Sequence, residues 1–208
     1  MSVVTNLKES AMSSNLQDDI AYMKALAEAG NAGPLRSGYI LMWAGIIFSL
    51  ASIGQYLLMT GVLPQQAWVS FAIWFGLGGL FGVIAWLRNR QCRAITATGK
   101  ASSSVWSAVG LGIGASLITV ILVVYQTHET MALSFIAPIL IVLYGVGWWV
   151  DARMSGLAWL KLVALGCFVA APVLGLMAAM PEQMLAYAGC LLLLASLPGY
   201  ILMKAEKA

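Results

Sequence analysis

The chain has 208 residues, of which 61% are hydrophobic and only 9% are charged, with a formal net charge of +3. This composition excludes an ordinary soluble domain, because too few charged side chains remain to cover a surface that faces water. It therefore argues against soluble enzymes and nucleic-acid-binding modules and favours a protein embedded in a membrane.

The first predicted element lies in the polar segment before the first apolar run. Ser13 or Ser14 can cap a helix there, and Gly30 can end it. Between them, apolar residues recur at helical spacing at Leu16, Ile20, Met23 and Ala27. We expect a short amphipathic helix within a cytoplasmic segment that covers residues 1–37. Two roles stay open for it: it lies at the membrane interface or against its own chain, or it docks another protein.

The same segment also carries a family resemblance. It reads Asp19-Ile20-Ala21-Tyr22-Met23-Lys24-Ala25-Leu26-Ala27-Glu28-Ala29-Gly30 and continues with Ala32-Gly33-Pro34-Leu35 before the first apolar run. This opening, about the first quarter of the chain, resembles that of small uncharacterised proteobacterial inner-membrane proteins. The resemblance implies a bacterial inner membrane. It implies no catalytic residues, because that family has no assigned activity.

Six apolar runs follow, each close to the length of about 20 residues that a helix needs to cross a bilayer. They cover residues 38–59, 67–87, 104–125, 131–150, 157–179 and 184–203. The turns around Pro64, His128 and Pro181 are short, so consecutive helices are expected to be antiparallel neighbours. We predict an all-α polytopic membrane protein with a six-transmembrane-helix bundle over residues 38–203 and a cytoplasmic tail over residues 204–208.

The orientation of the bundle is predicted by its basic residues. All of them fall before the first run, between alternate runs, at the start of the fifth run or after the last: Lys8, Lys24, Arg36, Arg88, Arg90, Arg93, Lys100, Arg153, Lys161, Lys204 and Lys207. The loops on the other side carry only His128, Glu129 and Glu182 as ionisable residues. Because basic loops resist translocation, both termini are expected in the cytoplasm.

Lys161 is the only charged residue inside a predicted run, and no Asp or Glu lies inside one. The usual intramembrane carboxylate for proton or cation coupling is therefore expected to be absent. Lys161 lies close enough to the cytoplasmic end of its run for its ammonium group to snorkel to the interface. The alternatives are a binding pocket that faces the cytoplasm and a lipid head-group site shared with Arg153.

Two prolines suggest a cavity between the fourth and fifth runs. Pro138 and Pro172 lie at similar depths, so their helices could kink at one level and open a cavity outward, with Gln55 among the polar residues that line it. Ordinary kinks that packing tolerates are the alternative. In that case Gln55 bonds to a neighbouring helix instead.

Glycines suggest a close helix pair. Gly78 and Gly82 in the second run, and Gly110 and Gly114 in the third, show the small-xxx-small spacing that lets helix backbones approach closely. We expect the second and third helices to pack tightly, against each other or against another chain.

The inventory of reactive groups favours a non-enzymatic protein. One His and three Cys without a C-x-x-C spacing predict no metal site, and no catalytic motif or cofactor-binding motif is present. We therefore expect an accessory, assembly or sensing and interaction component of the inner membrane. The alternative is a small permease or exporter for an apolar or cationic compound. The expected partners are the lipid bilayer and either another membrane protein or a second copy of the chain, but not nucleic acid.

Overall fold

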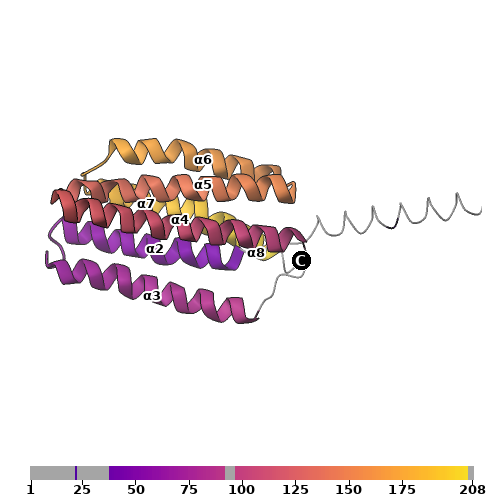
Figure 1. Cartoon of the computed structure of the whole chain (residues 1–208), viewed down its shortest axis with the longest axis horizontal. Coiled ribbons are helices and arrows are strands. Elements are labelled where there is room, and N and C mark those ends of the chain that lie inside the picture. The colour runs from indigo at the N-terminus through magenta and orange to yellow at the C-terminus, as the bar shows by residue number, and fades with distance from the viewer. Residues whose placement is uncertain (1–21, 23–37, 92–96, 206–208) are drawn as a thin grey trace, which may run out of the picture.

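The computed structural model describes residue 22 and the ranges 38–91 and 97–205, and this part of the chain is helical (Figure 1). The helices, in chain order, are α2 (Gly38–Met59), α3 (Ala67–Gln91), α4 (Ala97–Thr127), the 3-10 helix η1 (Thr130–Phe135), α5 (Ile136–Ser155), α6 (Ala158–Leu176), α7 (Glu182–Leu191), the π-helix η2 (Leu192–Ser196) and α8 (Leu197–Ala205).

Six helical stretches within this described part are long and apolar enough to cross a membrane. Four are single helices, the fourth in chain order joins η1 to α5, and the sixth joins α7, η2 and α8. The predicted all-α bundle of six spans is thus confirmed. The predicted amphipathic helix in residues 1–37 and the stretch that carries the family resemblance lie outside the described residues.

Several helices run further than the apolar runs that predicted them, α4 and α5 most of all. The fourth helical stretch of the bundle, α5, ends at Ser155 rather than at residue 150, and α4 begins at Ala97 rather than at residue 104. Gly156, which follows α5, has a φ of 72°, the left-handed conformation that commonly ends a helix. Hydropathy marks where the chain is apolar, whereas backbone hydrogen bonds continue through polar residues. Asp151 and Arg153 therefore belong to α5 and not to a loop.

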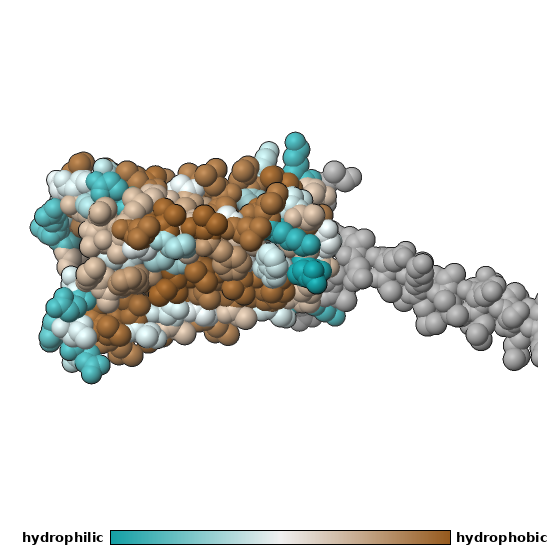
Figure 2. Space-filling model, turned by 90° about the horizontal axis from the view of Figure 1, so that it is seen from above, coloured by the Kyte–Doolittle hydropathy of each residue, from teal (hydrophilic) through white to brown (hydrophobic). Residues whose placement is uncertain are grey.

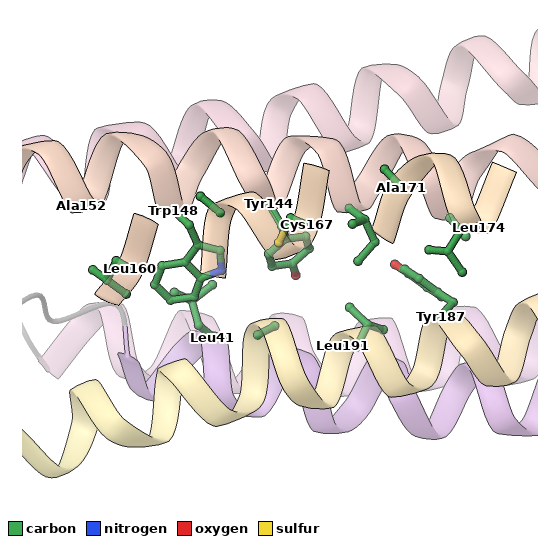
Figure 3. Packing of buried hydrophobic residues seen from close by; sticks show 14 of the residues in the cluster. Leu41, Tyr144, Trp148, Ala152, Leu160, Cys167, Ala171, Leu174, Tyr187 and Leu191 are labelled. Carbon is green, nitrogen blue, oxygen red and sulfur yellow. The ribbon is translucent and has the colours of Figure 1, made fainter. Parts of the chain in front are cut away.

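The core lies where α5 and α6 meet α2 and the last span (Figure 3). Its largest fully buried apolar side chains are Ile141, Trp148, Leu160, Leu174 and Leu191. Two helices stand outside this group: α4 packs against α5 and η1, and α3 packs against α2 at the edge of the bundle (Figure 1).

Glycines bring α2 and the last span into backbone contact. A Cβ atom added to Gly199 would stand 2.5 Å from the backbone N of Met42 and 2.7 Å from the carbonyl O of Gly38. One added to Gly45 would stand 2.7 Å from the backbone N of Ser196. The Ser196 hydroxyl donates a hydrogen bond of 3.1 Å to the Met42 carbonyl across the same contact. Only glycine fits at Gly45 and Gly199, so the backbones of α2 and the last span form a close helix pair there.

The predicted close pairing of the second and third spans with each other is wrong. A Cβ atom added to Gly78, Gly82, Gly110 or Gly114 would meet nothing within 4 Å. The physical reason is that other side chains orient the two helices: α3 is bonded to α2 through Gln55, and α4 turns Trp106 toward α5. The other half of the prediction, contact of these glycines with another chain, stays a prediction.

A tryptophan on α5 supplies the hydrogen-bond donor that a proline in the last span lacks. Pro198 has no N–H, so it cannot donate to the carbonyl of Leu194 one turn earlier. The indole Nε1–H of Trp148 donates to that carbonyl at 2.8 Å. The Trp148 side chain is 0% exposed and lies between α5 and the last span (Figure 3). This hydrogen bond links two helices and supplies a partner to a backbone group that water cannot reach.

Candidate functional site

Polar side chains gather at both ends of the bundle, and its visible middle surface is largely apolar (Figure 2). The end at which α8 terminates is called the basic end, and its described basic residues are Arg88, Arg90, Lys100, Arg153, Lys161 and Lys204. The opposite end carries His128, Glu129 and Glu182. Near the basic end, one acidic residue, Asp151, is enclosed by the helices.

Asp151 lies in the last turns of α5 and is 0% exposed. Its Oδ2 atom accepts a hydrogen bond of 2.7 Å from the indole Nε1–H of Trp106 on α4. The indole is a neutral donor, so it offsets part of the cost of burying the carboxyl group but supplies no opposite charge.

Trp106 is held in place by α5 on several sides. Its ring lies edge-on to Trp148, with centroids 5.1 Å apart, and tilted against Tyr144, with centroids 5.7 Å apart. Gly147 makes room for it, because a Cβ atom there would stand 3.1 Å from the indole carbon Cη2. The aromatic cluster Trp106, Tyr144 and Trp148 therefore fixes the direction from which the indole approaches Asp151.

Two polar atoms beside this hydrogen bond have no partner among the described residues. They are Oδ1 of Asp151 and the hydroxyl Oγ of Ser102 on α4, which is 1% exposed. The Ser102 hydroxyl lies next to the Asp151 carboxyl group. Buried polar atoms are nearly always paired, and an unpaired one costs about 1–3 kcal/mol. The group formed by Ser102, Trp106 and Asp151, called the Asp151 site below, is the candidate functional site.

The prediction that no acidic residue lies inside a span is therefore wrong. It failed because Asp151 stands beside Arg153 just past the apolar run, where a loop was expected. A signal was present in the spacing: the buried stripe of α5 passes through Ala137, Ile141, Tyr144 and Trp148 at helical intervals and next reaches Asp151. The helical spacing predicts that this carboxyl group is buried in the bundle, whereas the hydropathy of the segment predicts that it lies in a loop.

Lys161 and Arg153 also lie at the basic end. Arg153 is exposed in the last turn of α5, and Lys161 is half-buried in the first turn of α6. The structure pairs neither of them with an acidic side chain of its described part. Snorkelling of Lys161 stays a prediction, and so do the pocket and the shared head-group site.

Pro138 and Pro172 are brought together, as their similar depths suggested. Both line a groove of about 430 Å³ on the surface between α5 and α6, together with Phe135, Ile139, Val142, Ala171 and Gly175. Every lining residue is apolar, which suits a lipid chain better than a hydrated path. Pro138 lies in the first turn of α5, directly after η1, and the Ser134 carbonyl four residues earlier accepts a hydrogen bond of 2.8 Å from the Gln183 side-chain amide instead. Pro172 lies inside α6.

Gln55 joins α2 to α3. Its Oε1 atom accepts hydrogen bonds from the Ser70 hydroxyl at 2.7 Å and from the Trp74 indole N–H at 3.2 Å. This is the arrangement expected if Gln55 bonds to a neighbouring helix. A contact with a ligand at this residue stays a prediction.

Comparison of the chain with family models, with curated proteins and with solved structures found no match.

Proposed function

We propose that this integral membrane protein is a non-enzymatic interaction component that binds a second copy of itself within the bilayer. The observation that carries the proposal is the isolation of α3. Its main helical neighbour is α2, and no residue from Ala67 to Arg88 is buried in the chain. A span that contributes so little to the core of its own chain is free to pack against a second chain.

The outward face of α3 has the pattern of a helix-packing seam. Exposed residues recur at alternating intervals of four and three, at Trp68, Ala72, Phe75, Gly79, Gly82 and Trp86. This heptad spacing keeps a seam in contact with a partner helix that crosses at a small angle. Lipid needs no small residues, whereas two backbones can approach closely only where residues are small. The glycines in the middle of the seam therefore favour a helix as its occupant.

A second copy suits the seam because two copies share one orientation in the membrane. Related by a two-fold axis along the membrane normal, they present α3 to α3 in parallel. Gly79 and Gly82 of one copy then meet the same residues of the other at the crossing point. The large aromatic side chains lie on either side of that point and pack around it.

Disulfide cross-linking in membranes tests the proposal. In a background in which the three natural cysteines are serine, Gly79→Cys is expected to cross-link into a dimer when oxidised, because the crossing point brings two copies of this position together. Val169→Cys on α6, which is 66% exposed, is the matched control and is expected to stay monomeric. No dimer for Gly79→Cys, or equal dimer for both variants, would contradict the proposal.

We also propose that the protein lies in a bacterial inner membrane with both termini in the cytoplasm. This placement is supported by the family resemblance of residues 19–35 and by the basic end, to which basic residues of α3, α4, α5, α6 and α8 all belong. Cysteines introduced at the exposed residues Gln65 and Glu182 are expected to react with an impermeant thiol reagent added to intact cells. Cysteines at Ser2 and Lys207 are not expected to react. The reverse pattern would invert the orientation.

A second candidate, the small permease or exporter for an apolar or cationic compound, is favoured by one observation. The buried Asp151 supplies the intramembrane carboxyl group that the apolar runs lacked. Accumulation of a lipophilic cation in vesicles, driven by a pH gradient and lost in Asp151→Asn, would support this candidate.

A further inference from the structure

We propose that Asp151 and Ser102 form a proton-binding site, in which the carboxyl group carries a proton on Oδ1 and donates it to the Ser102 hydroxyl. This inference is independent of the proposed self-association, because it concerns the contact between α4 and α5 and not the outward face of α3.

The surroundings of the Asp151 carboxyl group are neutral and closed to water. Asp151 is 0% exposed, and its hydrogen-bond partner among the described residues is the neutral Trp106 indole. An ionised carboxylate in such a place needs a cation or several strong donors, or it takes up a proton and becomes neutral. Ionisable side chains inside spans are by default sites of function for this reason.

This part of α5 and the elements packed against it carry four basic groups in the described part of the chain. The basic groups nearest the basic end are Lys100 on α4, Arg153 on α5 itself and Lys161 on α6, and Lys204 lies further away on α8. The remaining titratable groups that line the core beside α5 are Tyr144, Cys167, Tyr187 and Cys190. The structure joins none of these to the Asp151 carboxyl group by an ion pair or a hydrogen bond within its described part.

The number of hydrogen-bond donors and acceptors at the Asp151 site favours a protonated carboxyl group. An ionised carboxyl group only accepts hydrogen bonds, whereas a protonated one also donates one. Oδ2 already accepts from Trp106, so the proton belongs on Oδ1, next to the unpaired Ser102 oxygen. One proton pairs both unpartnered atoms and removes the buried charge, whereas a hydrogen bond donated by the Ser102 hydroxyl to an ionised Oδ1 would pair the atoms but leave the charge buried.

The same count disfavours a metal cation at this place. Hard cations take six or more oxygen ligands, or keep several waters. The Asp151 site offers one free carboxylate oxygen and one hydroxyl, and its third member is an N–H donor that cannot bind a cation. Two oxygen atoms are too few for such a cation but suffice to hold a proton.

Binding of the proton is linked to the docking of α4. Trp106 and Ser102 are both on α4, so movement of α4 away from α5 would open the carboxyl group to water from the basic end. The docked arrangement then binds one more proton than the opened one, and a rise in pH favours opening. Proton uptake draws on water at the basic end, and release returns the proton there.

Infrared spectroscopy of the purified full chain at pH 7 tests for the proton. The wild type is expected to show the C=O band of a protonated carboxylic acid, and Asp151→Asn is expected to lose it. Ser102→Ala should keep the band at a shifted frequency, because the acceptor of the O–H group is gone. Glu182→Gln, the matched control at an exposed acidic residue, should leave the band unchanged.

A second measurement uses the fact that asparagine imitates the protonated acid. Its amide oxygen can accept from Trp106 and its NH₂ group can donate to Ser102. The melting temperature of the wild type and of Glu182→Gln is expected to fall as pH rises above 7, while that of Asp151→Asn falls less. A wild type without the acid band, a band that survives in Asp151→Asn, or carboxylate bands that respond to sodium at constant pH would each overturn the proposal.

Discussion

Gly199→Leu is expected to lower the free energy of unfolding by about 3 kcal/mol, the upper end of the usual cost of overpacking. The added Cβ atom would stand 2.5 Å from the backbone N of Met42 and 2.7 Å from the carbonyl O of Gly38. These are backbone atoms of α2, so they cannot turn away as the end of a side chain can. The two helices must therefore separate, and the close dispersion contacts between their backbones are lost. Loss of helical circular dichroism on heating in detergent measures the effect.

Gly110→Leu is the matched control on α4, where an added Cβ atom meets nothing within 4 Å. Its effect is expected to stay within about 0.5 kcal/mol, as for a substitution away from packed features. If Gly110→Leu destabilises the protein as much as Gly199→Leu, the close helix pair has been assigned to the wrong glycines.

Trp148→Phe is expected to cost about 2 kcal/mol or more in the free energy of unfolding. The Leu194 carbonyl would lose the indole donor at 2.8 Å, and an unpaired buried acceptor alone costs about 1–3 kcal/mol. Trp148 is 0% exposed, so the smaller ring also leaves a cavity. The aromatic contact with Trp106, at 5.1 Å between centroids, weakens at the same time.

A double-mutant cycle with Pro198→Ala separates the lost hydrogen bond from the cavity. Alanine at this position restores an N–H that can donate to Leu194, so it should recover part of the stability lost in Trp148→Phe. In the wild-type background the carbonyl already has a donor, and the gain should be smaller. Equal effects of Pro198→Ala in the two backgrounds would show that the cavity accounts for the loss.

The spans themselves were predictable because the property that defines them is local. A helix in lipid must be apolar over about 20 residues and satisfies its own backbone groups, so each span is visible in its own segment of the chain. The bounds of α2, Gly38–Met59, were predicted to the residue. The ends of α4 and α5 were not, because a helix continues past the apolar run for as long as its backbone bonds are made.

The contact partners of Gly199 on α2 and of Asp151 on α4 were decided by tertiary structure. The small-xxx-small pattern predicted that some helices meet closely, but many glycines satisfy it, and the partner of Gly45 lies at Ser196, far along the chain. Which face a helix turns inward depends on side chains of other helices, such as Gln55 for α3 and Trp106 for α4. In a bilayer both faces of a helix are apolar, so hydropathy carries no signal that tells the protein-facing side from the lipid-facing one.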